Sequence, residues 1–315
     1  MGKVEPKRKK KRSFASRVKK EKFLLLMLLP GALYLLINNY LPMFGTIVAF
    51  KDMNYADGIL GSPWAGFANF EFLFRTEDAW IITRNTIAYN LVFIVSNLLF
   101  GVSAAILLNE IRVRLLARFY QSVMFLPYFL SAVVVGYLGF SMLSQEYGFI
   151  NKTVLEPLGF RQIAWYSEPE WWPYILPIVH LWKTLGYVSI IYLAAIIAID
   201  GEYYEAALID GASKWKQIVH ITLPQLKPMM IILTLLSVGH ILNADFGLFY
   251  QVPLDAGALY STTNVIDTYV YRALLHMGNI GMSSAAGLYQ AFVGFLVVLA
   301  SNWIVRQINK EHALF

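Results

Sequence analysis

Long apolar stretches alternate with shorter polar segments along most of the chain. Charge-free runs occupy residues 23–50, 85–109, 119–145, 184–199, 228–244 and 273–305. A helix needs about 20 apolar residues to cross a bilayer. The pattern therefore predicts six transmembrane helices, and the fourth reaches full length only if Lys183 lies inside the membrane. The predicted spans are residues 24–46, 86–109, 119–142, 174–198, 228–249 and 285–305.

Six such spans make the chain an all-α membrane protein. Its 315 residues are 57% hydrophobic and only 15% charged, whereas soluble domains carry about 25% charged residues, so no large soluble domain is expected. The predicted divisions are a basic N-terminal tail at 1–22, a transmembrane domain at 23–308 and a C-terminal tail at 309–315. The chain has no cysteine, so neither disulfide nor thiol chemistry can be argued.

Basic residues predict the orientation, because short cytoplasmic segments are enriched in Lys and Arg. Residues 1–22 hold eleven Lys and Arg against two Glu, a balance of +9 in a chain whose net charge is +6. The link between the second and third spans carries Arg112, Arg114 and Arg118 and also faces the cytoplasm. Alternation then places both termini and residues 200–227 in the cytoplasm. A cleaved signal peptide is disfavoured, because the basic region is too long and no small-residue cleavage site follows.

Two groups of side chains near or inside the spans are assigned structural roles. The tryptophans at predicted helix ends fit interfacial aromatic belts, and these are Trp171, Trp172 and Trp303. The asparagines of the second span are expected to form hydrogen bonds between helices, and these are Asn85, Asn90 and Asn97.

Residues 200–227 form a polar segment between the fourth and fifth spans. A helix is predicted from Glu202 to Asp210, then a bend at Gly211, because glycine tolerates a left-handed backbone. A second helix, capped by Ser213, is predicted to run to His220, and Leu223-Pro224 to close the unit. On composition alone the pair fits either a docking element for a basic partner or interfacial helices resting on lipid.

The spacing within this segment matches a known pattern. Glu205-Ala206-Ala207, three residues, Gly211, nine residues, Ile221, one residue and Leu223-Pro224 resemble the EAA loop of bacterial ABC-importer permeases. The chain after its basic tail also resembles the oligosaccharide branch of that family, in particular LplB-type, aldouronate-type permeases. The likeness includes NTIAYN at the second span and VIDTYVYRALLHMGNIGMSSAAGLYQ before the sixth.

This resemblance implies a type I importer permease fold in a bacterial cytoplasmic membrane. The implied partners are a cytoplasmic ABC ATPase dimer, a second and different permease subunit, and an extracytoplasmic sugar-binding protein. The chain contains no GxxxxGK[ST] phosphate loop, so ATP is expected on the partner ATPase, and neither a cofactor nor catalysis is expected here. The implied ATPase contact consists of Glu202, Glu205, Ala206, Ala207, Asp210, Gly211 and Ala212.

Charged groups inside membrane helices are candidates for function because burying them is costly. Lys183 lies within the fourth span, and Asn243 and Asp245 lie in the outer half of the fifth. We expect these three to line a sugar route, since sugars combine hydroxyls with apolar ring faces. The candidate stacking side chains are Trp182, Tyr187 and Tyr137. A structural ion pair between the two helices, or a position of Asp245 near the interface, is the alternative interpretation.

Other functions remain as alternatives. The histidines show no metal-ligand spacing, and no metal site is expected. The same ABC machinery could carry a non-sugar solute. An ion-coupled secondary transporter is disfavoured because no inverted repeat is visible, and a membrane receptor that docks a partner without transport would show no substrate flux. The sequence does not distinguish acidic from neutral oligosaccharides, identify the partner proteins, or show whether this subunit contacts substrate.

Overall fold

The computed structural model describes residues 22–308. Residues 1–21 of the predicted N-terminal tail and the whole predicted C-terminal tail, 309–315, lie outside this range. Within it the chain is almost entirely helical, and its only β pairing is one isolated bridge between Lys51 and Trp64. Five segments are long and apolar enough to cross a membrane, and a bent helix pair supplies a sixth. The five are Lys22–Phe50, Glu77–Asn109, Pro169–Ile197, Lys214–Gly239 and Ile280–Gln307. The all-α, six-span prediction therefore agrees with the structure.

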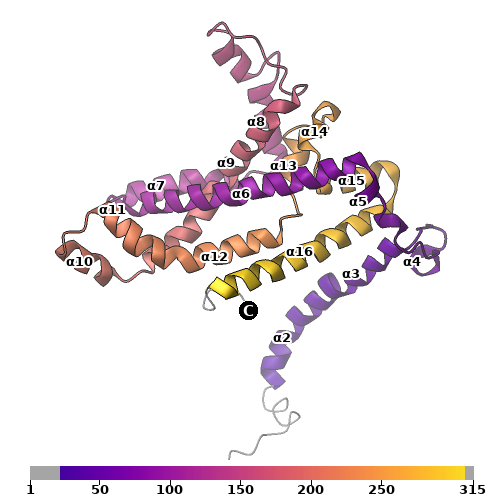
Figure 1. Ribbon diagram of the computed structural model, residues 1–315, viewed down its shortest axis with the longest axis horizontal. Helices are drawn as coiled ribbons and strands as arrows, with labels where there is room; N and C mark the ends of the chain where they lie inside the picture. The colour runs from indigo at the N-terminus through magenta and orange to yellow at the C-terminus, as the bar shows by residue number, and fades with distance from the viewer. Residues whose placement is uncertain (1–21, 309–315) are drawn as a thin grey trace, which may run out of the picture.

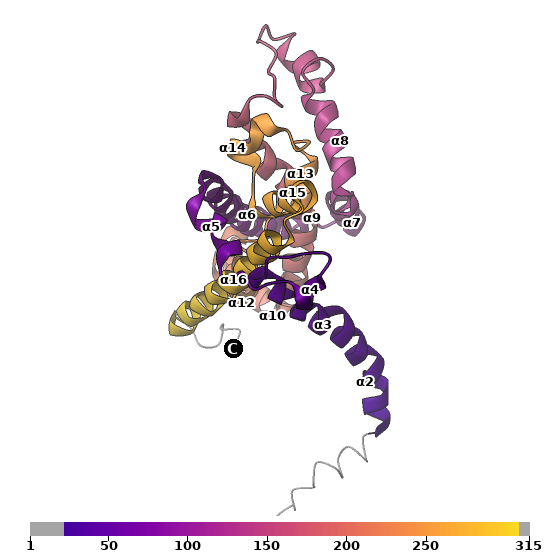
Figure 2. The same cartoon turned by 90° about the vertical axis from the view of Figure 1, so that its right-hand side faces the viewer.

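The first span stands apart from the others. It consists of α2 (Lys22–Leu35), a π-helical turn (Leu36–Tyr40), α3 (Leu41–Met43) and a 3-10 helix (Phe44–Phe50). Every residue of α2 and α3 is exposed, and both views show them leading away from the bundle (Figures 1 and 2). Only the 3-10 helix reaches the bundle, where it packs on α16 (Ile280–Ile308).

The second and fourth spans form the centre of the bundle. They are α6 (Glu77–Asn109) and α9 (Trp172–Ile197), which pack along each other. The side chain of Thr76 accepts a hydrogen bond from the backbone N–H of Ala79 and caps α6. The carboxylate of Glu77, in the first turn, is stabilised by the positive end of the helix dipole. Gly101 of α6 permits close packing on α9, because a Cβ at this position would lie 2.6 Å from a Val188 methyl carbon.

The third span is bent, so the prediction of one helix over 119–142 is wrong. It consists of α7 (Arg114–Phe125), a 3-10 turn (Leu126–Phe129) and α8 (Ala132–Leu143), and the two halves meet at 99°. Pro127 cannot donate a backbone hydrogen bond. Leu130 and Ser131 are extended, and the Ser131 side chain accepts from Val134 N–H to begin α8.

The fifth span also differs from the predicted 228–249. It starts earlier, because α11 (Lys214–Gln217), a π-helical turn (Ile218–Thr222) and α12 (Leu223–Gly239) are continuous. Leu223-Pro224 therefore does not close the cytoplasmic unit, because the helix continues through these two residues directly after the π-helical turn. The span ends at Gly239, and a non-helical segment leads to α13 (Phe246–Gln251).

Shorter helices occupy the connections. Figure 1 shows α10 (Gly201–Ile209), the start of α2 and the end of α16 toward one side of the molecule, and α4, α14 and the segment after α8 toward the other. This division agrees with the predicted topology. The remaining elements are α4 (Gly58–Gly61), a 3-10 turn (Ala68–Phe70), α5 (Phe72–Arg75), a π-helical turn (Ile150–Leu155), 3-10 turns Pro169–Trp171 and Gly257–Leu259, α14 (Tyr260–Thr263) and α15 (Ile266–Met277).

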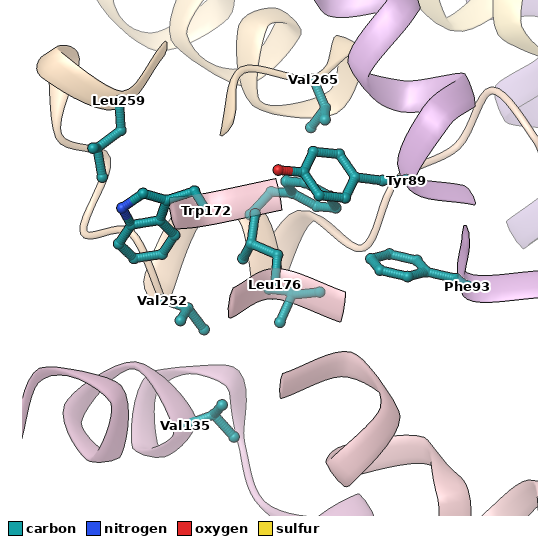
Figure 3. Packing of buried hydrophobic residues seen from close by; sticks show 10 residues of the cluster. Tyr89, Phe93, Val135, Trp172, Leu176, Val252, Leu259 and Val265 are labelled. Carbon is teal, nitrogen blue, oxygen red and sulfur yellow. The ribbon is translucent and has the colours of Figure 1, made fainter. Parts of the chain in front are cut away.

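The main hydrophobic core lies where α6, α9 and the connections after α13 meet (Figure 3). Trp172 and Leu176 of α9 are fully buried there, against Tyr89 and Phe93 of α6. The Trp172 indole donates a hydrogen bond to the Trp165 carbonyl at 2.8 Å. The prediction that Trp172 belongs to an interfacial belt is therefore wrong: it is a core residue, because the outer loop folds back over it.

Candidate functional site: a cytoplasmic loop and a broken membrane helix

The cytoplasmic loop between α9 and α11 has the predicted helix–bend–helix form. The Asp200 side chain accepts the Glu202 N–H at 3.0 Å and caps α10, so Gly201 begins this helix. Gly211 has φ +73°, a conformation that favours glycine, and Ala212 N–H donates to the Ala207 carbonyl across the bend at 2.9 Å. The sequence of the loop thus fixes the direction in which α10 leaves the membrane helices.

Most of this loop is solvent-exposed. Glu202, Glu205, Ala206, Asp210 and Gly211 are exposed, while Ala207 and Ala212 are partly buried. The structure adds apolar residues that the sequence interpretation did not name as contacts. Ile209 is 87% exposed and Trp215 71%, and burial of such side chains on binding is favourable. An exposed fraction cannot be inferred from a helical pattern this short, which is why these two were missed.

Three interactions attach the loop to the membrane helices. The Tyr204 and Thr222 hydroxyls are hydrogen-bonded at 2.9 Å. Lys214 forms an ion pair with Glu110, at the inner end of α6, at 3.2 Å. The buried Gln217 amide donates to the Ala212 carbonyl at 3.3 Å. These contacts connect α10 and α11 to the start of the fifth span and to the end of the second.

In the membrane, Lys183 of α9 is partly buried and forms no ion pair with Asp245. The structural ion pair considered as an alternative is therefore absent. One turn further along α9, the Tyr187 ring stacks on Tyr128 with centroids 4.6 Å apart and planes at 7°. Phe125 stacks on Tyr128 at 5.7 Å and on Tyr187 at 6.5 Å. These three rings form an aromatic cluster at the bend of the third span, one helical turn from Lys183, which forms no ion pair among the residues that the structure describes.

The other two proposed stacking residues do not belong to this aromatic cluster. Trp182 and Tyr137 are 44% and 70% exposed. Neither forms a ring contact among the residues that the structure describes. Tyr128, which the sequence interpretation did not name, is the partner of Tyr187. It was missed because which rings meet at the bend depends on the packing of α9 against it.

The break after α12 is held by side chains from other helices. Non-helical backbone at membrane depth must be satisfied by protein groups or water. The Asn90 amide donates to the carbonyls of Ile241 and Asn243, at 2.9 and 3.1 Å. The Gln290 amide donates to the Leu242 carbonyl at 2.7 Å. Every carbonyl from 241 to 243 therefore has a side-chain donor.

Asp267, at the start of α15, completes this arrangement. Its carboxylate accepts the Ala244 N–H at 2.7 Å and the Gln290 amide at 3.2 Å. Burial raises the pKa of the Asp267 carboxyl above its ordinary value. Asp245 has a different role, since its Oδ1 accepts the Leu248 N–H at 3.1 Å and caps α13. Asn243 and Asp245 are both exposed at the break and not within a helix.

A half-buried polar network joins α6 and α9 nearer the cytoplasmic end of α6. The Asn97 amide nitrogen lies 3.2 Å from His180 Nε2, and its oxygen accepts the Thr184 hydroxyl at 3.0 Å. The His180 ring stacks on Phe93 at 3.8 Å. With the bonds from Asn85 to the carbonyls of Ser261 and Asn264, these contacts confirm that the asparagines of the second span link helices.

Comparison with known proteins shows which family the chain represents. A family model described as binding-protein-dependent transport system inner membrane component matches residues 97–310. The chain belongs to this family. It is therefore a multi-pass permease subunit of the bacterial cytoplasmic membrane, as the sequence predicts.

Two curated relatives from Bacillus subtilis strain 168 extend the likeness over the whole chain. The polygalacturonan/rhamnogalacturonan transport system permease protein YteP is 35% identical, over 97% of this chain and 94% of its own. Protein LplB is also 35% identical, over 95% and 93%. A chain in the crystal structure of a bacterial ABC transporter involved in import of the acidic polysaccharide alginate matches with a TM-score of 0.85 and 32% identity, covering 94% of this permease and 99% of that chain.

Proposed function

We propose that this permease forms half of the translocation pathway of an ATP-driven importer for acidic oligosaccharides. A cytoplasmic ATPase dimer would bind the loop between α9 and α11, a second permease would complete the pathway, and an extracytoplasmic binding protein would deliver the sugar. The alginate transporter that it resembles has also been crystallised with an alginate pentasaccharide-bound periplasmic protein, which supports the last of these partners.

The ATPase-binding role rests on the exposed loop. Glu202, Glu205 and Asp210 present negative charge beside exposed apolar side chains, a combination suited to a partner with a basic rim and an apolar groove. Because Tyr204 and Lys214 tie the loop to two membrane helices, force applied to α10 reaches the fifth span and the inner end of the second.

The acidic substrate class rests on Lys183. This ammonium lies in a membrane helix without a carboxylate partner among residues 22–308, which is costly unless the site is solvated or a ligand supplies the negative charge. The aromatic cluster of Phe125, Tyr128 and Tyr187 lies one helical turn from Lys183 and offers aromatic side chains for sugar stacking. Relatives that carry polygalacturonan and alginate, both polymers of uronic acids, fit this combination.

Reconstitution in proteoliposomes with the partner permease, ATPase and binding protein tests the proposal. Acidic and neutral oligosaccharides of equal length are compared by binding-protein-dependent ATP hydrolysis and by uptake. Lys183→Gln should lower uptake of acidic oligosaccharides and leave neutral ones unchanged, and Lys152→Gln, in the outer loop, is the control. Stimulation by neutral sugars alone would refute the acidic substrate class. An equal loss for both sugar classes in Lys183→Gln would show that the lysine has a structural role.

A further inference from the structure

A small pocket opens on the outer part of α6, on the face that does not carry Asn97. It has a volume of about 250 Å³ and lies between α6, the first turn of α9 and Thr262 of α14. Arg84 and Asn85 form its polar end, and Ala88, Val92 and Pro173 its apolar end. A cavity that is charged at one end and apolar at the other fits an amphipathic ligand.

Arg84 supplies the charge. Its guanidinium donates to the Asn85 side chain at 3.0 Å and to the Ser261 carbonyl at 3.0 Å. No carboxylate lies within ion-pair distance of it in the part of the chain that the structure describes. Two neutral acceptors thus fix the orientation of the guanidinium while its positive charge stays uncompensated, as in a site for a phosphate or carboxylate group.

The apolar end continues into an exposed stripe along α6. Arg84, Ala88, Val92, Val95 and Leu99 are all exposed, and their spacing of three and four residues places them on one side of the helix. Val92, Val95 and Leu99 are 47%, 53% and 59% exposed. Exposed aliphatic side chains along a membrane-spanning helix are the surface that acyl chains cover.

The depth of Arg84 fits the headgroup region. It lies 25 residues before the inner end of α6 at Asn109, about 38 Å along the helix, whereas the hydrocarbon core is about 30 Å thick. A tilted helix therefore places Arg84 at the outer boundary of the hydrocarbon and Val92 about 12 Å deeper along the helix. Of the groups present at that boundary, the lipid phosphate carries the negative charge.

We propose that this pocket is a phospholipid site: Arg84 binds the phosphate of one outer-leaflet lipid, and its acyl chain lies along Ala88, Val92 and Val95. Tyr89, which also lines the pocket, is 6% exposed, and its hydroxyl has no hydrogen-bond partner among the described residues. The site would anchor the outer end of α6 and is independent of the sugar route, because it opens on a different face from Asn97 and Tyr187.

Lipid titration of the purified permease–ATPase complex, followed by native mass spectrometry, tests the site. Phosphatidylglycerol is compared with a phosphate-free glycosyl diacylglycerol of the same acyl chains. Arg84→Gln should weaken retention of phosphatidylglycerol about tenfold, the value of a charge-assisted hydrogen bond. Ala88→Trp, which fills the apolar end and keeps the charge, should also reduce retention, and Arg75→Gln, outside the pocket, should match the wild type.

Three results would overturn the proposal. Equal retention in all variants would show that lipid does not bind here, for example because the partner permease covers this face. Equal affinity for the phosphate-free lipid would show that Arg84 does not recognise phosphate. Displacement of phosphatidylglycerol by equimolar inorganic phosphate would identify a free anion as the ligand. Each of these outcomes leaves the sugar-transport proposal unaffected.

Discussion

Gly186→Ala tests whether the aromatic cluster of Phe125, Tyr128 and Tyr187 depends on close contact between the third and fourth spans. A Cβ at Gly186 would lie 2.1 Å from the Met124 carbonyl oxygen and 2.6 Å from the Phe125 Cα. Both atoms are backbone, so neither moves out of the way by a change of rotamer. Small residues allow such approach between membrane helices, and this one sets the position of α9 against the end of α7.

The size of the effect follows from these distances. An ordinary contact begins near 3.4 Å, so α9 and α7 must separate by about 1.3 Å at this point. Overpacking of this kind costs about 1–3 kcal/mol. The neighbouring Tyr187 would move with α9 and lose its 4.6 Å stack on Tyr128, so transport should fall more steeply than stability.

The assay compares thermal unfolding of the purified complex with binding-protein-dependent uptake in proteoliposomes. Gly31→Ala is the matched control, because a Cβ at Gly31 in the first span meets no atom within 4 Å and alanine is the better helix former. We expect a midpoint lowered by several degrees and strongly reduced uptake for Gly186→Ala only. If both variants match the wild type, the helices do not touch at Gly186 and the argument from this contact fails.

Three further changes test other parts of the structure. Glu205→Lys should lower co-purification of the ATPase by about tenfold or more, since it opposes like charges at an interface, and Glu146→Lys in the outer loop should not. Asn90→Leu leaves two carbonyls of the break without a donor and should lower the unfolding free energy by about 1–3 kcal/mol, with Asn38→Leu in the first span as a neutral control. Burial raises the pKa of Asp267 above its ordinary 3.8, so the stability it contributes is full below that value and is lost as the pH rises through the raised pKa. The midpoint of Asp267→Asn should therefore vary less over this acidic range than that of the wild type, and identical pH profiles would contradict the assignment.

The number of spans, their order and the position of the cytoplasmic loop could be predicted from the sequence. Hydropathy reports where a segment lies, because a segment that crosses the hydrocarbon must be predominantly apolar whatever its conformation. The spacing from Glu205 to Leu223 is equally local, since a glycine at the bend and a cap at Ser213 act within a few residues. Hydropathy and the spacing of the loop both depend on residues close together in the sequence, so neither requires knowledge of the tertiary structure.

The break in the fifth span could not be predicted in this way. Residues 240–244 are apolar or polar without charge, and a hydropathy profile does not distinguish a helix from an extended segment of the same composition. What makes the break possible is a set of donors and acceptors on other helices. Asn90 and Gln290 come from the second and sixth spans, so their effect on the fifth depends on tertiary structure. The role of Asn90 in bonding between helices could be foreseen, but its partners could not.

The two breaks belong to one structural unit. A Cβ at Gly136 of α8 would lie 2.6 Å from the Gln251 carbonyl oxygen, and one at Gly247 of α13 would lie 2.6 Å from the Ala132 Cβ. The outer halves of the third and fifth spans are therefore packed backbone to backbone, and each joins its inner half through non-helical residues. Val135 of α8 and Phe249 of α13 are also buried in the core that α6 and α9 form, so motion of α8 and α13 together requires changes in these contacts as well as in the two joints. The Lys214–Glu110 ion pair connects the cytoplasmic loop to the second span, and Asn90 of that span holds the joint before α13.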